Sequence, residues 1–174
     1  YFTYWTKASN SSSGEYYDDG YTFVNRDGST TALYDFMKEI MADNTKFAPT
    51  ISHFDYNASQ IFGSNTDSSL DNAHITWSPS YDAQASFRWI TNVTTNKEYT
   101  LVTELYDDEK CNYMYMIMNT IDTYYGGNQN ITVTFDSSVT RFYVYDQYGN
   151  RTAHTGNTYS VTLAAGQAVY VMPY

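Results

Sequence analysis

Hydrophobic and polar residues alternate in short runs along the carboxyl-terminal half of the chain, and turn residues separate the runs. Each run is rich in β-branched and aromatic residues, which favour strands, whereas Gly, Pro, Asn and Asp gather between the runs. The pattern predicts strands at residues 74–77, 85–91, 99–106, 112–120, 131–135, 141–146, 158–163 and 168–172. Because no helical pattern lies between them, we expect a mainly β fold, an antiparallel β-sandwich or jelly roll of about eight strands.

A helical pattern lies ahead of these strands. Apolar residues recur there at intervals of three and four, which places them on one face of a helix over residues 32–47. These residues are Leu33, Phe36, Met37, Ile40, Met41 and Phe47. Ser29, Thr30 and Thr31 offer oxygens for the N-cap, and Pro49 is expected to end the helix. A single amphipathic helix cannot bury its own apolar face, so it must pack on the sandwich or on another domain.

The chain divides by composition into three parts. Residues 1–49 contain an aromatic, strand-like start, an acidic loop and the helix, and residues 74–174 form the sandwich. Residues 50–73 lie between them: the apolar residues up to 62 indicate an extended segment that introduces the sandwich, and the polar remainder indicates a linker. We expect the domain boundary within this middle part.

Period-two alternation assigns strand residues to two faces of a sheet. We expect the core between the sheets to contain Met114, Met116, Met118, Phe142, Val144, Val169 and Val171. The tyrosines that alternate with them would then share the outer face, namely Tyr113, Tyr115, Tyr143, Tyr145 and Tyr170. Such a face could bind sugar, or it could be the surface on which the helix and the segment 50–62 dock.

Composition and charge narrow the choice of ligands. The chain contains 20 Tyr, 9 Phe and 3 Trp, and its formal net charge is −10. Tyrosine combines an apolar ring with a hydroxyl group, so a tyrosine-rich surface suits contact with sugars, although each tyrosine could equally straddle core and surface. The negative charge opposes binding to nucleic acid and anionic membranes. No apolar run is long enough to span a bilayer, and the start of the sequence, which lacks a signal-peptide pattern, indicates an interior stretch of a longer protein.

The sequence offers no arrangement typical of a metal, cofactor or nucleophile site. Its three histidines, His53, His74 and His154, lack metal-ligand spacing. Cys111 is the single cysteine, and we expect it to be a small structural residue rather than a reactive thiol. The acidic segment 15–21 lacks the alternating ligands of a calcium loop, so a solvated turn is favoured over a weak calcium site.

The order of features resembles the end of a (β/α)8-barrel glycoside hydrolase, particularly the β-galactosidase-like enzymes. The aromatic stretch 1–5 ends in Trp5, the turn Asn25-Arg26-Asp27-Gly28 precedes the helix, and a β-domain follows that ends in the segment 165–171, with the sequence AGQAVYV. In such enzymes the last barrel strand ends in an aromatic residue at the active site, so the resemblance implies that Trp5 lies at a sugar subsite. The resemblance covers nearly the whole chain in order and character rather than in an invariant motif.

The resemblance also implies that the catalytic residues lie elsewhere. In that family the paired carboxylates of the retaining mechanism come from the fourth and seventh barrel strands, which this sequence does not contain. The acidic clusters that it does contain lie in polar turns, where nothing would raise a pKa or fix a separation. They are Glu15, Asp18, Asp19, Asp107, Asp108 and Glu109. We therefore expect no hydrolytic activity from the chain alone.

These observations predict a non-catalytic carbohydrate-binding region of a secreted, bacterial glycoside hydrolase. Sugar rings would stack on aromatic faces, polar side chains would bond the hydroxyl groups, and binding would concentrate the catalytic barrel of the same polypeptide at its polysaccharide or oligosaccharide substrate. The candidate binding residues are Trp5, Trp77, Tyr81, Arg88, Trp89, Tyr113, Tyr115, Arg141, Tyr143 and Tyr145. For Trp77 and Trp89, a place in the core is the alternative.

Two other functional classes fit the same pattern. The chain could be a purely structural domain that closes a barrel hydrolase, with its aromatic face against the barrel. An exposed apolar patch and self-association would favour that class. It could also be an extracellular adhesion domain, for which the ligand would be a protein.

Overall fold

The computed structural model describes residue 23 and residues 28–62, 87–96, 100–121 and 127–174. The chain divides into two compact units, Tyr1–Ala48 and Pro49–Tyr174. Most of the described part of the first unit is the helix α1 (Ala32–Ile51), whose last residues belong to the second unit. The strand predicted at residues 74–77 lies outside the described residues.

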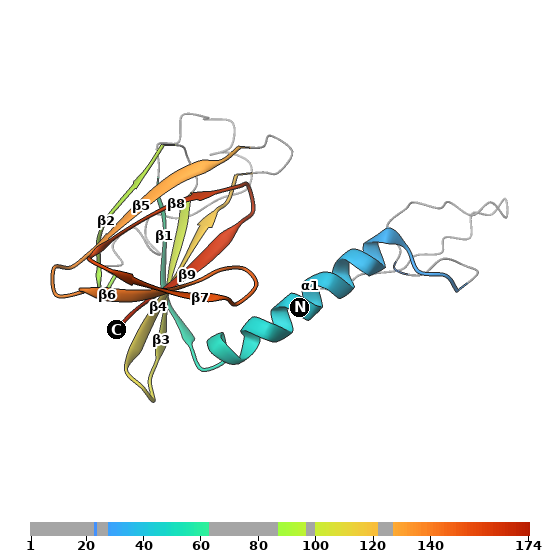
Figure 1. The fold of residues 1–174 in the computed structure, drawn as a ribbon, viewed down its shortest axis with the longest axis horizontal. Coiled ribbons are helices and arrows are strands. Elements are labelled where there is room, and N and C mark those ends of the chain that lie inside the picture. Colours follow the sequence, from blue (N-terminus) through green and yellow to red (C-terminus); the bar gives the residue numbers. More distant parts are fainter. Residues whose placement is uncertain (1–22, 24–27, 63–86, 97–99, 122–126) are drawn as a thin grey trace. The chain divides into compact units, whose positions relative to one another are not determined.

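The second unit contains two antiparallel sheets that form a β-sandwich, as the alternating pattern predicts (Figure 1). The six-stranded sheet has the order β1-β3-β4-β9-β6-β7, and the three-stranded sheet has the order β2-β5-β8. The first sheet consists of β1 (Asp55–Phe62), β3 (Thr100–Asp107), β4 (Asn112–Asn119), β6 (Arg141–Tyr145), β7 (Arg151–Thr155) and β9 (Ala168–Pro173). The second consists of β2 (Ile90–Thr95), β5 (Gln129–Phe135) and β8 (Thr158–Leu163).

The hydrophobic core lies between the two sheets. Phe135 of the smaller sheet contacts Tyr115 and Phe142 of the larger one, with ring centroids 5.8 and 5.5 Å apart. Five further side chains in the same cluster are at most 1% exposed, namely Val102, Ile117, Ile131, Val133 and Val171. Each such side chain contributes about 1.5–3 kcal/mol through removal of apolar surface from water. This burial holds the two sheets together.

The strand β4 turns its residues the opposite way from the sequence expectation. Tyr115 and Ile117 are fully buried in the core cluster between the sheets, so the methionines that alternate with them lie on the other side of the six-stranded sheet, where Met116 and Met118 are partly exposed and Met114 is fully buried. Pairing explains the choice, because Ile117 lies opposite Val102 on β3 and Val169 on β9. These β-branched neighbours form one continuous apolar layer. The expectation that the methionines of β4 form the core and its tyrosines the outer face is therefore wrong.

The strands β6 and β9 follow the expectation. Phe142 and Val144 of β6 and Val169 and Val171 of β9 belong to the core cluster. Their alternation partners Tyr143 and Tyr145 consequently lie on the outer face, as do Tyr170 and Met172, which stand opposite them in the pairing of the two strands. The outer face of the six-stranded sheet therefore carries methionine and tyrosine side chains, together with Leu101 and Leu105 of β3, which pair with Met118 and Met114 of β4.

Three strands differ from the sequence pattern. The strand β1 lies in the segment 50–62, which was expected to precede the sandwich at residues 74–174, yet it pairs with β3 as an edge strand of the six-stranded sheet. The strand β2 begins at Ile90 and extends beyond the predicted range 85–91, while β7 was not predicted, because its residues Arg151–Thr155 include a single aliphatic side chain, Ala153. As an edge strand, β7 needs no apolar alternation: four of its five residues are exposed, and pairing with β6 positions it.

The helix α1 begins at the predicted N-cap but ends later than predicted. Thr31 Oγ1 accepts a hydrogen bond from the backbone N–H of Tyr34 at 3.3 Å. Pro49 lies inside the last turn, and the helix continues to Ile51. A proline removes one backbone donor and crowds the carbonyl four residues earlier, and this close to the end it is tolerated.

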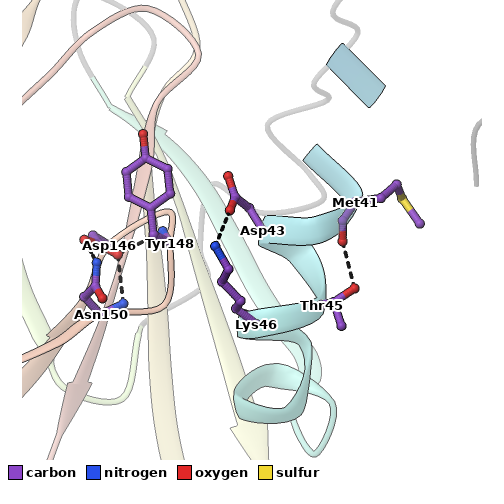
Figure 2. A network of polar contacts seen from close by, with 7 residues as sticks. All are labelled: Met41, Asp43, Thr45, Lys46, Asp146, Tyr148 and Asn150. Carbon is purple, nitrogen blue, oxygen red and sulfur yellow. Dashed lines mark hydrogen bonds and ion pairs between the residues drawn. The ribbon is translucent and has the colours of Figure 1, made fainter. Parts of the chain in front are cut away.

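Local polar contacts support the exposed surface of α1 (Figure 2). Lys46 Nζ lies 2.9 Å from Asp43 Oδ1, and the Thr45 hydroxyl donates to the Met41 carbonyl at 2.8 Å. The ion pair is solvent-exposed and contributes only about 0.3–0.5 kcal/mol. These contacts add to helix stability without defining a binding site.

Candidate functional site

The structure separates the predicted sugar-binding residues into four sets. Trp5, Trp77 and Tyr81 lie outside the described residues. Tyr115 is fully buried and Tyr145 is only 7% exposed, so neither ring offers a face to a ligand. The remaining five fall into two groups, one around Trp89 and one around Tyr143.

The first group is an aromatic rim at the edge of the core. The Trp89 ring is covered by the Arg88 guanidinium at 4.7 Å and meets the Tyr113 ring edge-on at 6.5 Å. Tyr113 in turn packs on Tyr106 at 4.6 Å. Trp89 and Tyr113 are partly buried against the core cluster, which agrees with the alternative that Trp89 is a core residue. Their faces are largely used by the protein itself.

A buried polar network lies beneath this rim. Glu104 is 1% exposed, and its carboxylate accepts hydrogen bonds from the Asn57 side-chain amide and the Arg88 backbone N–H, both at 2.6 Å. The Tyr115 hydroxyl donates to the same carboxylate and accepts a hydrogen bond from the backbone N–H of Trp89 at 2.9 Å. Burial, and then the Glu104 carboxylate, raise the pKa of Tyr115. Because these bonds use the carboxylate oxygens of Glu104, the network is structural.

The second group lies on the outer face of the six-stranded sheet, near its β6–β7 edge. The Tyr174 ring is stacked on the Tyr143 ring, with centroids 4.1 Å apart and planes 10° from parallel. The Arg151 guanidinium lies over the same Tyr143 ring at 4.4 Å. Since a parallel ring fills one face of Tyr143, the guanidinium must lie over the other. Both faces of Tyr143 are thus occupied.

Tyr174 carries the accessible ring of this group. It is 54% exposed, and its backbone N–H donates to the Arg141 carbonyl at 3.2 Å, which fixes the residue beside the start of β6. We call Arg141, Tyr143, Arg151 and Tyr174 the tyrosine–arginine patch. In this patch the ring of Tyr143 supports that of Tyr174 from one side and leaves the opposite side toward solvent.

The tyrosine–arginine patch combines a neutral hydroxyl group with two positively charged guanidinium groups. Loss of contact with water, and then a hydrogen bond with Tyr143, raise the pKa of the Tyr174 hydroxyl, while Arg141 and Arg151 act in the opposite direction. In the described part of the chain, neither arginine lies within ion-pair distance of an acidic side chain. The hydroxyl is therefore neutral and the two guanidinium groups are positively charged near neutral pH.

The adjoining hairpin carries another exposed tyrosine, Tyr148, which is separate from the patch. The Asp146 carboxylate accepts hydrogen bonds at 2.9 Å from the backbone N–H groups of Tyr148 and Asn150 and so fixes the turn between β6 and β7 (Figure 2). The Tyr148 ring is 49% exposed and points away from the side chains of Asp146 and Asn150. Within the described residues, the Tyr148 ring makes no contact with another aromatic ring or with a cation.

The sequence identified half of the patch. Arg141 and Tyr143 were among the predicted binding residues, whereas Arg151 and Tyr174 were not. The missing signal was the β6–β7 hairpin: Gly149 and Asn150 are turn residues, but the strand that follows them lacks an apolar alternation. Pairing across that turn places Arg151 opposite Tyr145 and next to Tyr143 on one face.

Other kinds of site find no support within the described residues. There, no group of three or more His, Cys, Asp or Glu side chains could hold a metal ion. The helix in this part of the chain is not apolar enough to cross a membrane. A scan against models of known protein families found no match to this chain, and searches of curated proteins and of solved structures found none either.

Proposed function

We propose that the chain is a non-catalytic, carbohydrate-binding accessory region of a secreted polysaccharide-degrading enzyme, and that the tyrosine–arginine patch binds the sugar. The observation that carries this proposal is the exposed Tyr174 ring, held nearly parallel to Tyr143 at 4.1 Å. A flat ring with one free side can stack against the apolar face of a pyranose. The Tyr174 hydroxyl and the guanidinium groups of Arg141 and Arg151 can bond the sugar hydroxyls around it.

The patch is organised before a ligand arrives. Stacking of aromatic rings contributes about 0.5–1.5 kcal/mol, and a cation over a ring at an exposed site contributes about 0.5–1 kcal/mol. These contacts restrain Tyr174 and Arg151, whose ordering on binding would otherwise cost about 0.5–1.5 kcal/mol for each side chain. A single exposed ring still gives weak binding, which becomes effective when the region is linked to a catalytic domain.

The test is electrophoresis of the chain through native gels that contain dissolved polysaccharides. We expect retardation by at least one polysaccharide, and a loss of about tenfold or more in affinity for Tyr174→Ala, because about 1.4 kcal/mol of stacking corresponds to a factor of ten. Tyr148→Ala is the matched control, since Tyr148 is exposed to a similar extent, 49% against 54%, but lies outside the patch. Circular dichroism would verify that both variants are folded.

Two results would overturn the proposal. One is a chain that none of the polysaccharides retards. The other is a Tyr174→Ala variant that binds as well as the wild type.

A structural role is the second candidate, and the outer face of the sheet favours it. This face carries Leu101, Leu105, Met116 and Met118, each partly exposed, at the positions where a solvated sheet would carry polar residues. Flexible methionines suit a contact surface, so the face could pack against the catalytic barrel of the same polypeptide. On this alternative the isolated chain would bind a hydrophobic dye and would not be retarded by polysaccharide.

A further inference from the structure

We infer that the polysaccharide bound at the tyrosine–arginine patch is acidic, with carboxylate or sulfate groups on its sugar rings. This inference rests on the proposed carbohydrate-binding function and specifies the class of ligand. It follows from the arrangement of the arginines rather than from the aromatic stack. A neutral sugar would need only a stacking surface and scattered hydrogen-bond donors.

The two arginines lie on one face of the sheet, on either side of Tyr143. On β6, Arg141 is two residues before Tyr143 and Tyr145 is two residues after it. Arg151, on β7, lies opposite Tyr145. Strand alternation therefore directs Arg141, Tyr143 and Tyr145 to the same side as Arg151. Both arginines are exposed, and the contact at 4.4 Å holds the Arg151 guanidinium over the Tyr143 ring. A guanidinium held by its face keeps its N–H groups directed outward at its edge.

Neither arginine is neutralised by the described part of the chain, although the sequence is strongly acidic. The sequence has 19 Asp and Glu residues against 9 Lys and Arg, yet no described carboxylate approaches Arg141 or Arg151 within 4.0 Å. Two lysines show the contrast, since Lys46 lies 2.9 Å from Asp43 and Lys110 lies 3.7 Å from Asp107. Solvation alone could satisfy a surface arginine. Two arginines without an ion-pair partner among the described residues, however, lie beside the stacked rings of Tyr143 and Tyr174. Their guanidinium N–H groups suit an anionic ligand group.

The net charge of the chain makes the inference sharply testable. At −10, the protein as a whole repels a polyanion, so nonspecific attraction would not imitate binding at the patch. Only a local site with concentrated positive charge would overcome that repulsion. Added salt should weaken such binding, because the Debye length falls from about 10 Å at 0.1 M to about 3 Å at 1 M.

The experiment compares polysaccharides that share a backbone and differ in charge. Affinity electrophoresis would use carboxymethylcellulose, cellulose sulfate and neutral hydroxyethylcellulose, polygalacturonate with its methyl ester, and carboxymethyl dextran, dextran sulfate and neutral dextran. We expect the acidic members of at least one set to bind about tenfold more tightly than the neutral one. Carboxylated and sulfated members, compared directly, identify which anionic group is preferred.

Variants assign the preference to the patch. Arg141→Gln and Arg151→Gln should each weaken binding of the acidic polysaccharide about fivefold more than they weaken binding of the neutral one. Arg88→Gln is the matched control, because it removes the same charge from the first group, where Arg88 covers Trp89 at 4.7 Å. Equal binding of acidic and neutral members, or an equal loss in Arg88→Gln, would overturn this inference and leave the carbohydrate-binding proposal standing. Failure to bind any polysaccharide would overturn both.

Discussion

At the scale of single residues, the contact of Tyr106 with Cys111 has a consequence that a titration of Tyr106 can measure. The Tyr106 hydroxyl donates to the Cys111 sulfur across the β3–β4 hairpin, and this hydrogen bond is the main cause that raises the pKa of Tyr106 to about 12. In Cys111→Ala the acceptor is lost, so we expect the pKa of Tyr106 to fall by more than one unit toward the ordinary tyrosine value of 10.0. NMR of ring-labelled tyrosine, recorded between pH 8 and 12.5, would measure it.

Cys111→Ser is the control for this prediction. A serine hydroxyl can accept the same hydrogen bond, so the pKa of Tyr106 should stay above that of Tyr106 in the alanine variant. Cys111 has a backbone φ of 53°. This conformation is unfavourable for cysteine, alanine and serine alike, so the comparison isolates the effect of the side-chain acceptor. An unchanged pKa in Cys111→Ala would show that another group holds the Tyr106 proton.

Residue types in the sequence predicted two of the four members of the tyrosine–arginine patch. Aromatic and arginine content directed attention to Arg141 and Tyr143, which the structure places in the patch. Tyr115 has the same residue type and alternation, yet it is fully buried and donates to Glu104. Its partner is 11 positions away in the sequence, on the adjacent strand, so no local pattern marks the burial. Tyr174 was missed because its contact with Tyr143 depends on the pairing of β6 with β9.

At the scale of elements, the link from β7 to β8 carries the chain from one sheet to the other. Gly156 makes this corner with a φ of +105°, and its N–H donates to the Thr140 carbonyl at 2.8 Å. A Cβ added there would meet nothing within 4 Å, so Gly156→Ala should suffer only from backbone strain. We expect the free energy of unfolding to fall by about 1–3 kcal/mol, the usual cost of a strained residue. Urea unfolding followed by circular dichroism would measure the change.

The variant Gly156→Asn tests whether backbone strain is the cause of the expected loss of stability. Because Asn tolerates positive φ better than Ala, Gly156→Asn should lie between the wild type and Gly156→Ala in stability. Should the alanine variant match the wild type, the corner would be able to adopt an ordinary backbone conformation, contrary to this prediction.

The strands themselves were largely predictable, whereas the faces of one of them were not. Composition and turns located β3, β4, β5, β6, β8 and β9 to within about two residues, because β-branched and aromatic runs are local signals. In β4 both alternating sets are apolar, with Met114 and Met116 on one side and Tyr115 and Ile117 on the other. Alternation alone cannot rank two apolar faces. Pairing with Val102 and Val169 decides the outcome, and that pairing is a long-range property.

At the scale of the whole molecule, one polar network ties the two sheets together. Glu104 and Tyr115 belong to the six-stranded sheet, and they bind the backbone N–H groups of Arg88 and Trp89, just before β2 of the three-stranded sheet. The Trp89 carbonyl in turn accepts from the Asp136 N–H at 2.7 Å, at the end of β5. A carboxylate that is 1% exposed is tolerable only because these donors replace its water.

Removing the Tyr115 hydroxyl should therefore destabilise the sandwich and change its response to alkali. Tyr115→Phe leaves the Trp89 N–H without its partner and Glu104 with one donor fewer, which should cost about 2–3 kcal/mol of unfolding free energy at pH 8. Burial is the main cause that raises the pKa of Tyr115 above the ordinary tyrosine value of 10.0, and the Glu104 carboxylate is the second cause. The folded state thus holds this proton more tightly than the unfolded chain, so the stabilisation is complete below pH 10 and declines as pH rises toward the folded pKa.

The loss of stability with rising pH distinguishes the Tyr115 hydrogen bonds from a simple packing contribution, which would not depend on pH. Tyr159 and Tyr170, whose pKa values burial also raises, contribute their own decline in both proteins. Above pH 10, the wild type should lose about 1.4 kcal/mol per pH unit more than Tyr115→Phe, because one bound proton is at stake. Urea unfolding at intervals from pH 8 to 11 would compare the slopes, with exposed Tyr148→Phe as the control that keeps the wild-type slope. Parallel slopes in wild type and Tyr115→Phe would mean that the Tyr115 hydroxyl titrates as it does in the unfolded chain, and the network would not tie the sheets as described.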